Sequence, residues 1–126
     1  KGKEEGIRIL LVEDNKINQK TTKIMLEKGA YIVEVASDGQ EAVEKFEKEE
    51  FDIILMDIQM PVMNGFEALS KIKEFDKNAK VVIISADIQK LSMDKALQLG
   101  AFNFIKKPID LEKMQQILGK INELDK

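Results

Sequence analysis

The sequence contains no cysteine and no histidine. Without cysteine it has no disulfide framework, no thiolate chemistry and no cysteine-based zinc site. Without histidine it has no histidine general base, no histidine metal ligand and no Ser-His-Asp triad of its own. Apolar runs stay well below the roughly 18 residues of a membrane span, and no signal peptide precedes the domain. We therefore expect a cytoplasmic domain without membrane contact.

An excess of positive charge is also absent. The 126 residues carry 20 basic and 23 acidic side chains, a net charge of −3. A basic surface for nucleic acid is therefore missing, and we expect no nucleic-acid partner. The apolar share of 44% is ordinary for a soluble protein, and one domain of this length can bury a core without disulfides.

Short apolar runs alternate with helix-like periods along the whole chain. The runs predict strands over residues 7–12, 31–35, 52–57, 80–85 and 102–106. Cap residues and apolar spacing predict helices that begin near residues 15, 37, 64, 88 and 110. The first helix runs to about residue 28 and stops at Gly29, with an apolar face made by Ile17, Thr21, Ile24 and Met25.

This alternation predicts an α/β fold: one doubly wound (βα)5 domain with a five-stranded parallel sheet. Two strand orders remain, a Rossmann-like half and the flavodoxin-like order 2-1-3-4-5. The first lacks its fingerprint, because no G-x-G-x-x-G follows the first strand. In the second order strands one and three are neighbours, so Glu13, Asp14 and Asp57 meet at their carboxyl ends.

Three carboxylates at one place repel one another, and a divalent cation with oxygen ligands resolves the repulsion. Mg²⁺ fits this donor set and usually adds a phosphate oxygen. Taken singly, Asp57 is equally well a strand-capping residue in a turn, and the Glu13-Asp14 pair also suits the start of the first helix.

Two further polar residues end strands four and five. Ser85 supplies a hydroxyl and Lys107 a fixed positive charge. With an aspartate and a divalent metal they can hold a phosphoryl group, with the Asp57 carboxylate as nucleophile. Each also has a plain alternative, a strand-end hydroxyl for Ser85 and a solvated lysine for Lys107. Their joint placement at four strand ends favours the phosphoryl site.

These motifs resemble the response-regulator receiver family, the phosphoacceptor domain of two-component signalling. The resemblance spans residues 7–124, which we take as the receiver domain, after a linker or frayed end at residues 1–6. Its motifs stand in family order: Leu11-Val12-Glu13-Asp14-Asn15, Asp38-Gly39-Gln40-Glu41-Ala42, Met56-Asp57-Ile58-Gln59-Met60-Pro61-Val62-Met63-Asn64-Gly65, Ser85-Ala86, Gly100-Ala101 and Lys107-Pro108.

The resemblance implies a role for each site residue. Asp57 would be the phosphoacceptor, Lys107 would pair with the phosphoryl group and Ser85 would hydrogen-bond to it. Mg²⁺ would be bound by Glu13, Asp14, Asp57 and the backbone carbonyl of Gln59.

A switch is implied as well. Ser85 would move toward the phosphoryl group and Phe104 would turn inward, changing the face made by the fourth helix, fifth strand and fifth helix. Phe104 has no hydroxyl, so its inward state gains no hydrogen bond there. The peptide bond before Pro108 is expected to be cis.

The predicted function is phosphorelay signal transduction, not enzymatic turnover of an external substrate. Because the chain has no histidine, the phosphohistidine donor would be a histidine kinase or a histidine phosphotransfer domain. Residues 15–18 and 59–63 resemble receivers fused to hybrid sensor histidine kinases. Since the sequence begins with Lys rather than Met, we expect a receiver attached to a kinase rather than a free-standing one, although single-domain receivers share these motifs. A kinase region of the same longer chain is then one further candidate donor.

Two other functions are compatible with parts of the pattern. A Mg²⁺-dependent phosphohydrolase would use Asp57 as nucleophile, but it would need an acid where the sequence has Gln59. A receiver-like binding module without phosphorylation would need none of the site residues, yet all of them are present.

Overall fold

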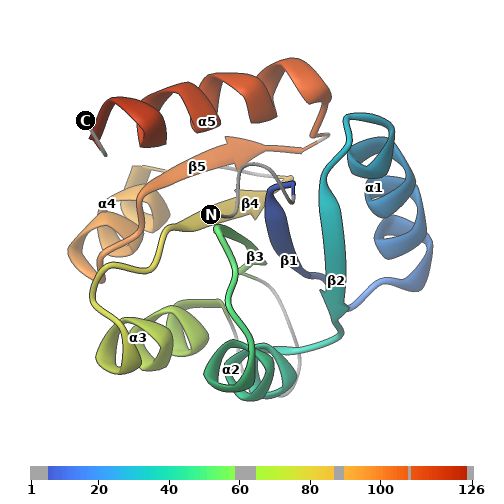
Figure 1. Cartoon of the computed structure of the whole chain (residues 1–126). Helices are drawn as coiled ribbons and strands as arrows, with labels where there is room; N and C mark the ends of the chain where they lie inside the picture. Colours follow the sequence, from blue (N-terminus) through green and yellow to red (C-terminus); the bar gives the residue numbers. More distant parts are fainter. Residues whose placement is uncertain (1–5, 59–64, 87–89, 108, 125–126) are drawn as a thin grey trace.

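The computed structural model describes residues 6–58, 65–86, 90–107 and 109–124, so Gln59 and Pro108 lie outside the described residues. Within these residues five strands alternate with five helices, as the sequence predicts (Figure 1). In chain order they are β1 (Arg8–Val12), α1 (Lys16–Lys28), β2 (Ile32–Ala36), α2 (Gly39–Lys48), β3 (Ile53–Asp57), α3 (Gly65–Phe75), β4 (Val81–Ser85), α4 (Lys90–Gln98), β5 (Asn103–Lys106) and α5 (Leu111–Leu124).

The five strands form one parallel sheet in the order β2-β1-β3-β4-β5. This confirms the flavodoxin-like order and places the reversal of strand order between β1 and β3. Helices α1 and α5 cover one face of the sheet, and α2, α3 and α4 cover the other (Figure 1). Among the described residues, every helix falls short of the length and apolar composition that a membrane span requires.

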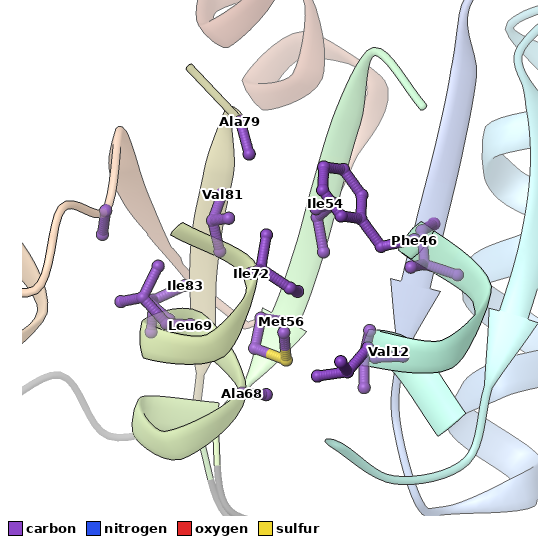
Figure 2. Close-up of a cluster of buried hydrophobic side chains, with 14 of the residues drawn as sticks. Val12, Phe46, Ile54, Met56, Ala68, Leu69, Ile72, Ala79, Val81 and Ile83 are labelled. Carbon is purple, nitrogen blue, oxygen red and sulfur yellow. The ribbon is translucent and has the colours of Figure 1, made fainter. Parts of the chain in front are cut away.

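The central strand β3 is buried along its whole length, because both of its faces are covered. Ile54 and Met56 point toward α2 and α3, where Phe46, Leu69 and Ile72 pack around them (Figure 2). The alternate residues of the strand, Ile53 and Leu55, join the core on the α1 and α5 side. Because β3 has no face toward solvent, its last residue, Asp57, is also buried, at the carboxyl-terminal end of the strand.

The inner face of α1 differs from the prediction. Ile17 and Ile24 are 76% and 46% exposed, whereas Leu26 is fully buried. Of the residues of α1, Leu26 is buried and Met25 packs against the core beside it, while Gln19, Thr22 and Lys23 are half-buried. The prediction was therefore right for Met25, which packs against the core, and wrong for Ile17 and Ile24.

The end of α1 also differs in detail. Gly29 is the C-cap, as expected for a stop, but its φ of −87° is ordinary. The left-handed residue is the next one, Ala30, with φ of 71°. Its N–H bonds to the Glu27 carbonyl, and the Tyr31 N–H bonds to the Leu26 carbonyl. These two bonds define a Schellman motif in which alanine occupies the position that glycine usually takes.

Candidate phosphoryl and metal site

Four strand ends build one polar site, and the sheet register brings them to the same level. Val12 pairs with Met56 and Asp57 pairs with Ile84. Ser85 pairs with Lys106, and the Lys107 N–H bonds to the Ser85 carbonyl at 2.8 Å. The residues that end or follow these strands, Glu13, Asp57, Ser85 and Lys107, therefore share the rim of the sheet next to the strand-order reversal.

Three acids converge at this rim, as the strand order predicts. Glu13, Asp14 and Asp57 each offer a carboxylate oxygen, and these oxygens all lie within 4.8 Å of one another. Glu13 and Asp57 are only 2% and 6% exposed, while Asp14 is open to solvent. Two buried carboxylates at this separation require compensation by positive charge.

Lys107 supplies that charge. Its Nζ donates to Glu13 Oε1 at 2.8 Å and to Asp57 Oδ2 at 3.1 Å. Burial by itself lowers the pKa of Lys107, but hydrogen bonds and charges from both acids outweigh burial and raise the pKa above its usual range. The ammonium is therefore held in its charged form between two acids. The contact with Glu13, which is the shorter one, was not predicted from the sequence.

Ser85 and Phe104 lie on strands that flank the acids. Ser85 is 5% exposed at the end of β4. Phe104 is half-buried on β5, level with Ile83 in the register, and packs against the apolar cluster on the α2–α4 side of the sheet. The two residues lie on neighbouring strands, at the end of β4 and within β5.

Glu13 makes several hydrogen bonds that no sequence motif indicated. Its N–H bonds to the Ala36 carbonyl at 3.0 Å, and its Oε2 accepts from the Asn15 N–H at 3.3 Å. Its own carbonyl accepts from the side-chain amide of Gln19. Sequence reasoning missed Gln19, because a glutamine on a helix carries no motif signal until the helix face is known.

The donor set fits a hard divalent cation. All three carboxylates supply oxygen, which is the ligand type that Mg²⁺ binds, and one side of the site is open at Asp14 for water or a phosphate oxygen. The backbone carbonyl of Gln59, the fourth predicted ligand, lies outside the described residues.

Fold and site together define the class: a flavodoxin-like α/β domain with an acidic, lysine-neutralised site at the reversal of strand order. The family model "Response regulator receiver domain" matches residues 9–119. The chain belongs to this family, and it is a CheY-like receiver domain of phosphorelay signalling.

Curated relatives agree with this placement. The chain is 42% identical over 117 residues to "Chemotaxis protein CheY" of Treponema pallidum, which covers 90% of the chain and 81% of that protein. It is also 39% identical over 115 residues to "Hybrid signal transduction histidine kinase B" of Dictyostelium discoideum, where the match covers 81% of the chain but 6% of the much longer kinase.

Solved structures show the same fold with ligands or partners. The CheX–CheY–BeF₃–Mg²⁺ complex from Borrelia burgdorferi matches with a TM-score of 0.82 and 38% identity over 95% of the chain and 93% of the matched one. The receiver domain of sensor histidine kinase PA1611 from Pseudomonas aeruginosa, with magnesium in its active-site cleft, matches with a TM-score of 0.83 and 32% identity. This match covers 91% of the chain and 96% of the matched one. The receiver domain of Ssk1, crystallised with the histidine phosphotransfer protein Ypd1 of Saccharomyces cerevisiae, matches with a TM-score of 0.80 and 31% identity. This match covers 87% of the chain and 84% of the matched one.

Proposed function

We propose that Asp57 accepts the phosphoryl group and that Glu13, Asp14 and Asp57 bind the Mg²⁺ that assists the transfer. The observation that carries this proposal is the buried Asp57 carboxylate, whose oxygen lies 3.1 Å from the Lys107 ammonium and within 4.8 Å of two further acids. A carboxylate so placed is fixed in direction and surrounded by groups that interact with phosphate.

The transfer is a displacement at phosphorus. An Asp57 carboxylate oxygen forms the new P–O bond while the P–N bond to the donor histidine breaks, and the leaving imidazole keeps the electron pair. The metal, when bound, neutralises charge on the phosphoryl oxygens. Lys107 offers its ammonium to a phosphoryl oxygen, and the Ser85 hydroxyl donates to another. The product is an aspartyl phosphate, and the domain turns over no external substrate.

The donor is a phosphohistidine on another domain. This chain has no histidine, so the phosphohistidine that we propose as the donor belongs to a histidine kinase or a histidine phosphotransfer domain. The receiver of Ssk1 in complex with Ypd1 and the receivers within hybrid kinases support this partner class. The similarity to receivers within hybrid kinases also supports a more specific proposal, in which the donor is a kinase region of a longer chain that contains this domain.

Phosphorylation would be read out at the face formed by α4, β5 and α5. Ser85 and Phe104 lie on neighbouring strands, so a shift of the hydroxyl toward the phosphoryl group changes the space available to the ring. We propose that Phe104 then turns inward from its half-buried position. A local change of charge would thereby alter a surface made by two helices.

The test is phosphate incorporation from acetyl phosphate with Mg²⁺, measured by intact mass. Wild-type protein should gain one phosphoryl group, and Asp57→Asn should gain none, because an amide is not a nucleophile here. Asp52→Asn is the matched control, since Asp52 precedes the other end of the same strand. Incorporation by Asp57→Asn at the wild-type level would assign the nucleophile to another residue.

A further inference from the structure

The peptide plane between Glu13 and Asp14 carries two of the three acids of the site, and one side chain holds it. The Glu13 carbonyl, which belongs to this plane, accepts a hydrogen bond from Gln19 Nε2. A peptide plane is rigid, so holding its carbonyl fixes the directions in which the Cα atoms of both residues project their side chains.

Gln19 is itself held on its other side. Its Nε2 also donates to Ser37 Oγ at 3.1 Å. Ser37 follows β2, and its backbone N–H bonds to Glu41 Oε1 of α2 at 2.8 Å. The amide of Gln19 therefore connects the loop after β1 to a turn that is already braced by α2.

Gln19 is half-buried on α1, and its amide is used in two hydrogen bonds, to the Glu13 carbonyl and to Ser37 Oγ. A partly buried polar side chain is expected to have its hydrogen bonds satisfied within the protein.

We propose that Gln19 is a positioning residue for the divalent cation: its amide fixes the Glu13–Asp14 peptide plane, so that the two carboxylates present their oxygens together with Asp57. This inference rests on the proposed metal site and adds a residue that touches neither metal nor phosphate. The carbonyl of Glu13 is turned toward Gln19, so its role is to hold the loop, while the side chains bind the ion.

The experiment is Mg²⁺ titration by calorimetry on wild type and Gln19→Met, which keeps the length of the side chain but removes the donor. Loss of one such hydrogen bond should weaken Mg²⁺ binding by about threefold to tenfold. Gln40→Met is the matched control, because Gln40 is a helical glutamine whose amide bonds to Glu44 in an exposed pair. It should bind Mg²⁺ like wild type.

A second readout separates positioning from general damage. In Gln19→Met the rate of phosphate incorporation from acetyl phosphate should be low at limiting Mg²⁺ and recover at saturating Mg²⁺. Ser37→Ala keeps the amide but removes its support, and it should show a smaller loss of Mg²⁺ affinity in the same direction.

The outcomes distinguish this inference from the proposed function. Wild-type binding with an unchanged dissociation constant in Gln19→Met overturns the positioning role and leaves the metal site standing. A rate that stays low at saturating Mg²⁺ also overturns it, because the defect then lies outside metal binding. Absence of Mg²⁺ binding by the wild type would overturn the metal site and this inference together.

Discussion

At the scale of single residues, the site depends on how one lysine compensates two buried acids. Lys107 contacts Glu13 and Asp57, and its pKa is raised above the usual range of lysine. The folded-state pKa therefore lies above that of the unfolded chain, about 10.4. As far as the titration of Lys107 is concerned, its contribution to stability is fully present below that pH and is lost as the pH rises through the raised value.

A second residue-scale feature is the left-handed Ala30. The same hydrogen-bond pattern ends α4, where the Gly100 N–H bonds to Leu97 and the Ala101 N–H bonds to Ala96. There the left-handed residue is Gly100, with φ of 101°. One of two equivalent helix ends thus has glycine in the left-handed position, and the other has alanine there, which costs about 1–2 kcal/mol.

Ala30→Gly should therefore stabilise the protein. Relief of the left-handed strain outweighs the extra flexibility that glycine gives the unfolded chain, and the free energy of unfolding should rise by about 0.5–1 kcal/mol. Urea unfolding followed by circular dichroism measures the change. Ala30→Val should act in the opposite direction, because a β-branched residue tolerates this φ least. A lower midpoint for Ala30→Gly would contradict this account.

At the scale of elements, α3 is pressed against the end of β3. The Gly65 N–H bonds to the Ile58 carbonyl at 3.2 Å. A Cβ at Gly65 would lie 2.6 Å from the Asp57 carbonyl oxygen and 2.6 Å from the Ile58 Cα. Both are backbone atoms, so neither can rotate away, and the approach of α3 to the acidic rim requires glycine at this position.

Gly65→Ala should destabilise the fold and disturb the site. Backbone displacement of this kind costs about 1–3 kcal/mol, and the displaced residue is Asp57, so phosphate incorporation should also slow. Urea unfolding and the acetyl phosphate assay measure the two effects.

The matched control is Gly119→Ala in α5, where an added Cβ meets no atom within 4 Å. It should raise the free energy of unfolding by about 0.8–1 kcal/mol, because alanine is the better helix former. Equal effects of the two substitutions would mean that contact with β3 is not what selects glycine at residue 65.

At the scale of the whole molecule, the proposed metal site would couple metal binding to folding. The three acids come from two segments more than forty residues apart, after β1 and at the end of β3, and only the folded sheet brings their oxygens within 4.8 Å. An ion that binds only this arrangement stabilises it by mass action, about 2.7 kcal/mol at one hundred times the dissociation constant.

Mg²⁺ should therefore raise the thermal midpoint of the wild-type protein in a concentration-dependent way. Asp14→Ala should abolish most of this rise, and it should leave the metal-free protein as stable as wild type or more so, because like-charge repulsion is relieved. Thermal scans with and without Mg²⁺ provide the measurement. An unchanged metal response in Asp14→Ala would remove Asp14 from the ligand set.

The sequence alone was sufficient for the order of elements, the parallel sheet and the location of the acids. Strands buried on both faces are continuous apolar runs, and Asp57 and Ser85 each follow such a run directly, while Lys107 follows the shorter edge strand β5. In a parallel sheet the carboxyl ends of all strands lie on the same side of the sheet. The meeting of these residues at one site can therefore be predicted from the apolar runs and the strand order. Only the choice between two strand orders needed a further argument, the missing glycine-rich fingerprint.

Tertiary structure decided which side of α1 is buried and which atoms meet at the site. Apolar spacing favoured Ile17 and Ile24, yet the sheet and the loop after β1 take up Gln19 and Leu26. The bond between Lys107 and Glu13 joins residues that are 94 positions apart. Periodicity is a local property, whereas a helix's rotation about its axis and a side chain's choice between two acids depend on neighbours from distant segments, which only the assembled fold provides.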